Sequence, residues 1–491
     1  MPGAGHGEPE GGPATKPTSR SAAKPQGGPR PQGEGAGRSK ARSPKRRGRG
    51  AATALDALAK VCGDVRPGEP EEGVLGVVPG IVAAPASVDE AAEVMRTAAE
   101  KGLAVVPRGA ETRLDWGTPP ERCDLLLDTS RLDAVVEHAA GDLVATVQAG
   151  LGTDRLAEVL AEKGQRLALD APIPGSTVGG TIATAAAGPL RLLYGSPRDL
   201  VIGLTVVRAD GRVARSGGKV VKNVAGYDLG RLFSGSYGTL GLIVEATFRL
   251  HPVPAARAYV TRTFPQAAGA ADAGEAVREA VREVLHSPTA PSAVEVVTGT
   301  GDTRIGAATG TGGAGEAADA DGAEDRAGGI TVGVLLEGVD AGVTARTAQV
   351  TAILGADATV SQEPPAWWGA YPDGTTLVEV TAPLSALPGL LAVVAETAPG
   401  AALTWSGDGR GHVGLPSGTS VDQAGRVLER LRGLLTGPPH RGGAVVRYAP
   451  ESLRAELDLW GPVPALSLMR RVKDQFDPEH RLSPGRFVGG L

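Results

Sequence analysis

The stretch from Pro174 to Pro252 constrains the fold of this 491-residue chain more than any other. It opens with Pro174-Gly175-Ser176-Thr177-Val178-Gly179-Gly180 and ends in Gly238-Thr239-Leu240-Gly241-Leu242-Ile243. Glycine allows positive φ and lets a ligand approach the main chain closely, and consecutive free N–H groups in such turns bind anions. We interpret the stretch as a backbone site for an anionic ligand. The alternative is a set of ordinary turns in a chain rich in alanine and glycine.

The overall composition argues against several classes of protein. The net charge is −5 and aromatic residues make up only 3% of the chain, so neither a positive field nor stacking platforms favour a nucleic-acid partner. No apolar run reaches the roughly 18 residues of a membrane-spanning helix, and no apolar signal-peptide core follows the N-terminus. We therefore expect a cytoplasmic protein.

The cysteine content limits the redox chemistry of the chain. Its two cysteines, Cys62 and Cys123, form no CxxC motif, which is typical of a reducing compartment. Iron–sulfur clusters usually take about four cysteines, so a cluster held by this chain alone is not expected. No paired-histidine helix motif occurs either, and we predict no metal site.

The chain is predicted to begin with a disordered tail over residues 1–50, which is rich in Gly, Pro, Ser, Lys and Arg and almost free of apolar side chains. The basic cluster Lys45–Arg49 indicates either a solvated tail or contact with an anionic surface. A first domain is predicted over residues 51–255.

This domain starts with a β-α-β unit. Ile81–Ala84 and Leu103–Val106 read as strands, and Ser87 with Glu90 forms a capping box that begins the intervening helix. The second strand leads into Pro107-Arg108-Gly109-Ala110-Glu111-Thr112, a polar loop that is a candidate phosphate cradle.

Further strands and one helix are expected before the next domain. They are strands at Asp124–Asp128, Ala134–His138 and Leu143–Gln148, a helix at Asp154–Lys163 capped by Thr153, a hairpin of Val201–Arg208 with Arg212–Ser216, and a strand at Leu242–Leu250.

The composition changes after Pro252-Val253-Pro254, and a second, α+β domain is predicted over residues 256–465 with a flexible insert at 299–329. Its elements read as a ferredoxin-like β-α-β-β-α-β order. They are Tyr259–Phe264, Glu275–Leu285, Ala293–Thr298, Thr331–Leu336, Thr344–Leu354 and Thr376–Val380. Residues 466–491 carry Leu482, Phe487 and Val488 among turn signals, so this segment is expected to return to the first domain.

Taken in order, these motifs resemble those of a known family. The glycine loops, the run Gly218-Lys219-Val220-Val221-Lys222-Asn223-Val224-Ala225-Gly226-Tyr227-Asp228 and the late Ser483-Pro484-Gly485-Arg486 are similar to the FAD-binding (PCMH-type) fold of vanillyl-alcohol oxidase and D-lactate dehydrogenases. Within it, the chain resembles the FAD-binding subunits of bacterial glycolate oxidase, and the E subunit most. The resemblance is strong over residues 75–255 and loose elsewhere. It implies an α+β chain: a two-subdomain FAD-binding domain followed by a ferredoxin-like cap.

The resemblance also implies a binding site for non-covalent FAD. In the family the two glycine loops embrace the pyrophosphate with backbone N–H groups, which agrees with the anion preference of such turns. The implied cofactor-binding residues are Pro107, Arg108, Gly109, Ala110, Glu111, Thr112, Pro174, Gly175, Ser176, Thr177, Val178, Gly179, Gly180, Gly218, Lys219, Asn223, Asp228, Gly238 and Ile243.

The chain departs from the family pattern at two positions. Glu111 stands where the first loop usually has another glycine, and Ser483 stands where the late motif usually has asparagine. A carboxylate beside a pyrophosphate is unfavourable unless it points away. Both changes leave a partly degenerate flavin site as an open alternative.

No catalytic base follows from the sequence. His480, beside an Asp-Pro turn, is open to an acid–base role or to a surface role. His138 and His251 do not flank a glycine loop, where a covalent flavin link would be expected. Arg486 is a candidate for a substrate carboxylate, since a guanidinium binds carboxylates in bidentate fashion.

The preferred hypothesis is an FAD-dependent subunit that oxidises glycolate or a similar 2-hydroxy acid. Electrons would leave through partners, a sister flavoprotein and an iron–sulfur subunit, with peripheral membrane association through that complex. Two alternatives stay open: a non-catalytic electron-relay or assembly subunit, and a stand-alone FAD-linked alcohol or lactone oxidase.

Overall fold

The computed structural model describes residues 53–170, 172–218, 228–266, 270–299 and 329–491. The predicted tail, the run 219–227 and nearly all of the predicted insert lie outside the described residues. In the part that is described, no helix is long and apolar enough to cross a membrane.

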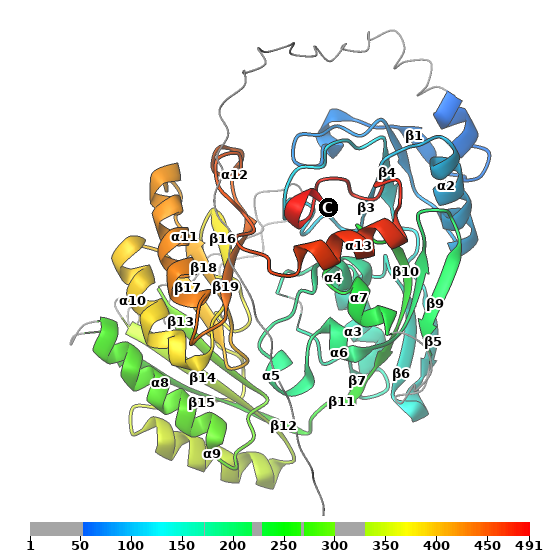
Figure 1. Cartoon of the computed structure of the whole chain (residues 1–491). Coiled ribbons are helices and arrows are strands. Elements are labelled where there is room, and N and C mark those ends of the chain that lie inside the picture. Colours follow the sequence, from blue (N-terminus) through cyan, green and yellow to red (C-terminus); the bar gives the residue numbers. More distant parts are fainter. Residues whose placement is uncertain (1–52, 171, 219–227, 267–269, 300–328) are drawn as a thin grey trace, which may run out of the picture. The chain divides into compact units, whose positions relative to one another are not determined.

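The first sheet has four strands in the order β1-β2-β4-β3 (Figure 1). Strands β2 and β3 both run parallel to β4, which lies between them. Ser87 accepts a hydrogen bond from Glu90 N and begins helix α2, as its capping box predicts. The elements are β1 Val65–Pro67, β2 Ile81–Ala83, α2 Val88–Glu100, β3 Val105–Arg108 and β4 Leu125–Asp128. The apolar side of α2 packs on this sheet through Ala91, Val94, Met95 and Ala98.

The second sheet has five strands in the order β5-β6-β10-β8-β9, all antiparallel. Strands β8 and β9 form the predicted hairpin, with Gly211 at φ 78. The strands are β5 Val135–Ala139, β6 Val144–Gln148, β8 Val201–Val207, β9 Val213–Gly217 and β10 Leu242–Arg249. The helices of this part are α3 Thr153–Ala161, α4 Val178–Thr184, α5 Arg191–Tyr194, α6 Pro197–Leu200 and α7 Leu229–Phe233. Helix α3 begins after Gly152, so Thr153 lies inside the helix and is not its cap.

A two-stranded sheet of β7 (Gln165–Arg166) and β11 (His251–Pro252) precedes the cap. The cap is one antiparallel sheet of eight strands in the order β15-β12-β14-β13-β17-β18-β16-β19. Its order shows two ferredoxin-like units joined edge to edge through β13 and β17. The first unit contains β12 Ala256–Pro265, α8 Ala270–His286, β13 Ala293–Thr298, β14 Gly329–Gly338, α9 Asp340–Leu354 and β15 Thr359–Ser361. The second contains β16 Thr376–Thr381, α10 Leu387–Thr397, β17 Ala402–Ser406, β18 Arg410–Leu415, α11 Val421–Leu435 and β19 Gly443–Tyr448.

One element of the cap corrects the sequence prediction. Thr376–Val380 was expected to close the first ferredoxin-like unit, but the structure closes that unit with β15 and opens the second with β16. All three residues of β15 are exposed, so this edge strand carries none of the apolar alternation by which strands are recognised.

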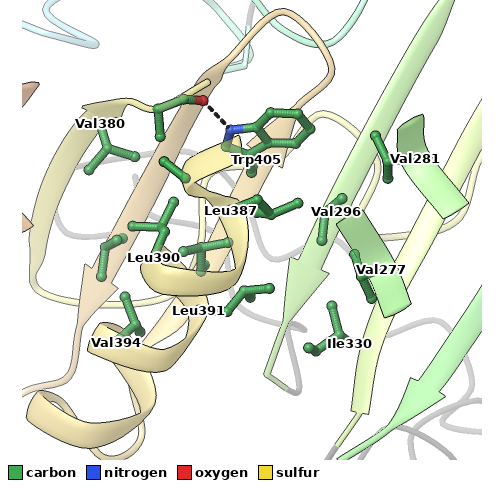
Figure 2. Close-up of a cluster of buried hydrophobic side chains, with 14 of the residues drawn as sticks. Val277, Val281, Val296, Ile330, Val380, Leu387, Leu390, Leu391, Val394 and Trp405 are labelled. Carbon is green, nitrogen blue, oxygen red and sulfur yellow. Dashed lines mark hydrogen bonds between the residues drawn. The ribbon is translucent and has the colours of Figure 1, made fainter. Parts of the chain in front are cut away.

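The cap core lies between the sheet and its helices. Figure 2 shows Val277 and Val281 of α8 and Leu387, Leu390 and Leu391 of α10 together with strand residues of both units. The indole Nε1 of Trp405 donates to Ala382 O at 2.8 Å, which satisfies the one polar atom of a fully buried side chain.

The C-terminal segment returns to the first sheet. Helix α12 (Glu451–Arg454) follows β19, and the C-terminal segment begins with α13 (Leu466–Phe476). Leu482 forms a parallel bridge with Val105 of β3, and its side chain is fully buried. The buried Lys473 Nζ donates to Thr239 O and Leu482 O at 2.8 Å each and pairs with Asp477 Oδ2 at 2.7 Å. This ammonium ties α13 to the residues that flank the pocket described next.

Candidate functional site

The first loop, Pro107–Thr112, begins at the end of β3. The guanidinium of Arg108 in this loop is held by three carboxylates. Its Nη2 lies 2.6 Å from Asp128 Oδ2, and its Nη1 lies 3.0 Å from both Glu72 Oε1 and Glu111 Oε1. Pairing with Arg66 first, and then with Arg108, lowers the pKa of Glu72 to about 2. The charge of Arg108 is therefore neutralised within the chain, and this side chain fixes the start of the loop.

Glu111 adopts the left-handed conformation, with φ 62. This is the region that glycine enters freely and other residues enter at a cost. The Glu111 side chain is 54% exposed and is turned toward Arg108. The carboxylate thus points partly into solvent and does not fill the gap between the loops.

The second loop, Pro174–Gly180, leads into the capped N-terminus of helix α4. Thr177 Oγ1 accepts a hydrogen bond from Gly180 N at 3.3 Å and begins α4. Gly175, at φ 72, donates its N–H to Asp154 Oδ2 at 2.9 Å. The loop is thereby fixed from both sides.

The two loops meet. A Cβ added at Gly109 would lie 2.4 Å from Thr177 Oγ1, so only glycine fits there. Thr112 Oγ1 lies 3.3 Å from Ser176 Oγ, and Arg113 Nη1 donates to the same Ser176 hydroxyl at 3.1 Å. Side-chain hydrogen bonds therefore join two loops that are far apart in the sequence.

Two further segments close the site. A Cβ at Gly238 would lie 3.1 Å from Pro107 Cγ and 3.2 Å from Ser483 Oγ, so the third glycine turn touches both the first loop and the C-terminal segment. Buried Ser483 has φ 45, and its hydroxyl has no hydrogen-bond partner among the described residues. Arg486 Nη2 donates to Leu114 O and Trp116 O at 2.8 and 2.9 Å.

These segments line a pocket with about 780 Å³ of empty space, counting the part open to solvent. Of the residues that the resemblance implies, those that line the pocket are Pro107, Arg108, Gly109, Ala110, Glu111, Thr112, Thr177, Gly179, Gly180, Gly238 and Ile243.

The other implied residues lie elsewhere. Pro174, Gly175, Ser176 and Val178 belong to the second loop but do not line the pocket. Gly218 donates its N–H to Ile202 O at the end of β9, and exposed Asp228 caps α7 through Arg231 N at 3.2 Å. Lys219 and Asn223 lie outside the described residues.

Sequence reasoning did not assign several residues that line the pocket: Arg113, Leu114, Thr129, Ala149, Ala183, Thr184, Tyr237, Gly241 and Leu242. Gly241 and Leu242 carried a signal, since they belong to the glycine run that was singled out. Arg113 directly follows the first loop, and its charge next to a phosphate cradle was a second available signal.

The cap reaches this pocket through Tyr237. Arg447 of β19 donates from Nη1 to the Tyr237 hydroxyl at 2.8 Å and pairs with Glu379 of β16 at 2.9 Å. Tyr237 also packs against Phe487 and Trp460, with ring centroids 5.3 and 5.9 Å apart. Of this aromatic cluster, Tyr237 lines the pocket.

The three histidines considered above are engaged elsewhere. His138 Nε2 lies 2.9 Å from Gln165 Oε1, and the His251 ring meets Tyr194 edge-on. Exposed His480 pairs with Asp474 at 2.8 Å. Among the described residues no group of three or more His, Cys, Asp or Glu is placed to hold a metal ion.

The residues present fit a dinucleotide cofactor. Small residues let the main chain of both loops reach the pocket, and Arg113 and Arg486 bring positive charge without a carboxylate ion pair among the described residues. Loops of this kind suit a pyrophosphate.

Comparison with known proteins agrees with this geometry. A family model described as "FAD binding domain" matches residues 79–217. Glycolate oxidase subunit GlcD of Bacillus subtilis is 41% identical over 178 residues, which are 36% of this chain and 38% of that protein's own length. An uncharacterised FAD-linked oxidoreductase of Mycobacterium tuberculosis is 30% identical over 437 residues, covering 84% of this chain and 91% of the relative.

Among solved structures, p-cresol methylhydroxylase matches with a TM-score of 0.66 at 18% identity, covering 89% of this chain and 96% of that one. This likeness concerns the fold: a two-part FAD-binding domain followed by an α+β cap. Together with the relative that is matched along nearly all of its length, these findings show that the chain belongs to the FAD-linked oxidoreductases and that its cofactor is FAD.

Proposed function

We propose that the chain is the FAD-binding subunit of an enzyme that oxidises a small 2-hydroxy acid such as glycolate to the 2-oxo acid. The observation that carries the proposal is the meeting of the two glycine loops at Gly109 and Thr177, beside a pocket whose three arginines include two, Arg113 and Arg486, with no carboxylate ion pair among the described residues. The meeting of the two loops favours a pyrophosphate, and the guanidinium groups favour an anionic substrate. The similarity to GlcD supports the substrate class.

Non-covalent binding of FAD is part of the proposal. No histidine or cysteine is among the pocket-lining residues that the structure describes, and the hydroxyl of the one tyrosine among them, Tyr237, accepts a hydrogen bond from Arg447 Nη1 at 2.8 Å. FAD, when bound, supplies the flavin that accepts the hydride from the hydroxylated carbon. The chain supplies the backbone donors of its loops, the positive charge of Arg113 and Arg486, and the aromatic ring of Tyr237 in the pocket wall.

Electrons are proposed to leave through partner subunits, a sister flavoprotein and an iron–sulfur protein, with any membrane association peripheral and through that complex. Cys62 and Cys123 are both buried thiols, and burial raises the pKa of Cys123 to about 12. An inert, neutral thiol is a poor cluster ligand, which supports an acceptor on another chain.

The test is direct. The purified chain is titrated with FAD and then mixed with glycolate or D-lactate without oxygen, while the flavin absorbance is followed. We expect one FAD per chain and loss of the oxidised flavin bands with at least one of these acids. A chain that binds no FAD, or a bound flavin that neither acid reduces even with partner subunits present, would refute the proposal.

A second candidate is an electron-relay or assembly subunit. It is favoured by one observation: Glu111 is the sole titratable acid or base among the described pocket-lining residues, arginines and tyrosine aside, and it is paired with Arg108. This candidate predicts FAD binding without reduction by 2-hydroxy acids unless a sister subunit is added. Rapid reduction of the isolated chain would exclude it. Oxygen consumption without any partner would instead indicate a stand-alone oxidase.

A further inference from the structure

Arg113 is a buried guanidinium at the junction of both loops and the cap. Arg113 is only 5% exposed, and it lines the pocket. Nη1 donates to Ser176 Oγ at 3.1 Å, and the guanidinium carbon lies 5.7 Å from the centre of the Trp116 ring. The second loop and an aromatic face therefore hold this group in one orientation.

Two of its three nitrogens have no hydrogen-bond partner among the described residues, namely Nε and Nη2. No carboxylate of the described part of the chain forms an ion pair with it, in contrast to Arg108, which has three. Burial accordingly lowers the pKa of Arg113, and its interaction with Tyr371 offsets part of this effect. A buried charge that the chain does not pair is costly unless a ligand pairs it.

The two unpartnered nitrogens lie on one edge of the planar guanidinium. From this edge the N–H groups of Nε and Nη2 donate in parallel, which matches the two oxygens of a carboxylate. Arg486 differs, because its Nη2 is bound to two backbone carbonyls and its unpartnered atom is Nη1. Arg113 is therefore the better bidentate group of the two.

The cap brings a neutral hydroxyl, that of Tyr371, into contact with the Arg113 side chain. Burial raises the pKa of Tyr371 to about 12, so its hydroxyl keeps its proton at neutral pH and can donate to an anion. The Tyr371 ring is held edge-on by Trp116 at 5.9 Å and by His412 at 4.7 Å. Tyr371 belongs to the cap, whereas Arg113 follows the first loop. The two residues therefore come from different parts of the chain.

We propose that Arg113 is the residue that binds the carboxylate of the substrate, with the Tyr371 hydroxyl as an additional donor. The inference rests on the proposed function and deepens it, because it explains how the site selects a hydroxy acid over a neutral alcohol. The backbone of the loops then serves the cofactor, and the Nε–Nη2 edge serves the substrate.

The experiment uses the FAD-loaded chain and oxalate, a dicarboxylate that has no hydrogen to give to a flavin. Oxalate binding is measured by calorimetry for the natural chain, Arg113→Met, Arg113→Lys and the control Arg122→Met, which changes an exposed arginine paired with Asp124. A charged hydrogen-bond pair predicts that Arg113→Met binds oxalate about 10- to 100-fold more weakly. We expect Arg113→Lys to recover part of that loss, and Arg122→Met to bind like the natural chain.

Arg113→Lys also guards against loss of the fold, since it keeps a buried positive charge and removes only the two-nitrogen edge. FAD content is measured for each variant and is expected to stay at one per chain. Unchanged oxalate affinity in both Arg113 variants overturns the inference. So does loss of FAD from a folded variant, because Arg113 would then serve the cofactor.

Reduction by glycolate separates this inference from the proposed function. If the natural chain binds oxalate through Arg113 but no 2-hydroxy acid reduces its flavin, the proposed function fails while Arg113 keeps its role as an anion-binding residue. If glycolate reduces the natural chain and Arg113→Met equally well at low concentration, the inference alone fails.

Discussion

Glu111 carries two costs that a glycine would avoid. Its φ of 62 lies in the left-handed region, and it places a negative charge on a residue that lines a pocket suited to a pyrophosphate. We predict that Glu111→Gly tightens FAD binding about fivefold, since an unfavourable interaction between two charges screened by water amounts to about 1 kcal/mol. Titration of the FAD-free chain with FAD measures the change.

Glu111→Gln is the matched control for this prediction, because it removes the charge and keeps the backbone cost. An improvement in both variants assigns the effect to charge, and an improvement with glycine alone assigns it to conformation. Equal FAD affinity in all three chains would contradict both explanations.

Glu295 makes stability depend on pH. Burial raises the pKa of this 3% exposed carboxyl to about 8, whereas its ordinary value is 4.5. The folded chain therefore keeps a proton that the unfolded chain releases, and stability falls as pH rises from about 5 to about 8. One unit of pKa difference between the folded and unfolded chain amounts to about 1.4 kcal/mol. The free energy of unfolding therefore falls by roughly 3 kcal/mol between pH 5.5 and 8.5.

Glu295→Gln is expected to remove most of this loss, because the amide oxygen can still accept from Gly369 N, which now lies 3.0 Å from the carboxyl. Urea unfolding at the two pH values measures it. Burial also raises the pKa of Asp170, to about 7, so a smaller slope of the same sign remains in the variant. Parallel pH profiles for both chains would show that Glu295 does not titrate as described.

Single side chains mark the limit of what the sequence predicts. The glycine loops could be found because a turn leaves a pattern of residues. Arg113 left only its charge next to the first loop as a signal. Its importance depends on Ser176, Trp116 and Tyr371, and only the folded chain shows that Nε and Nη2 lack partners among the described residues. The catalytic base stays unassigned for the same reason.

Helix α13 is joined to the first sheet by one buried ammonium. Replacing Lys473 by methionine would leave Asp477 buried without its cation and two carbonyls, Thr239 O and Leu482 O, without their donor. Breaking a buried pair from one side costs about 3–5 kcal/mol. We predict a loss of that size in the free energy of unfolding, measured with denaturant.

The same change should loosen the C-terminal segment selectively. Ser483 N donates to Val105 O, and exchange of this amide proton is expected to quicken in Lys473→Met. Arg470→Met, at an exposed position of α13, serves as the control and should leave exchange unaltered. Uniformly faster exchange across the first sheet would point to a general loss of stability instead.

Secondary-structure elements were predicted well where local chemistry is strong. Ser87 caps α2, as the capping box in its sequence predicts. The errors occur where local signals are weak: exposed β15 was passed over, and the doubling of the ferredoxin-like unit was missed. Helix α10 is apolar on most sides because α8 and α11 cover it, so it lacks the polar face of a typical surface helix.

A buried ion pair is one of the contacts that join the cap to the FAD-binding domain, beside the Arg447–Tyr237 hydrogen bond. Arg166 of β7 contacts both carboxylate oxygens of Glu337 in β14 at 2.6 and 2.7 Å, and the Tyr194 hydroxyl lies 3.0 Å from the same guanidinium. Such a contact between distant strands has no local signature, so its existence could not be predicted from the sequence. It does couple the stabilities of the two parts, because neither charge is well solvated without the other.

Arg166→Met is predicted to separate the unfolding of the two parts. The buried Glu337 carboxylate, 5% exposed, would lose its cation at a cost of about 3–5 kcal/mol, and thermal unfolding should change from one transition to two. Arg155→Met, at an exposed pair, should leave a single transition. Adding Glu337→Leu to Arg166→Met removes the uncompensated charge and should restore most of the stability. If the double variant is as unstable as Arg166→Met alone, the ion pair is not what couples the cap to the flavin domain.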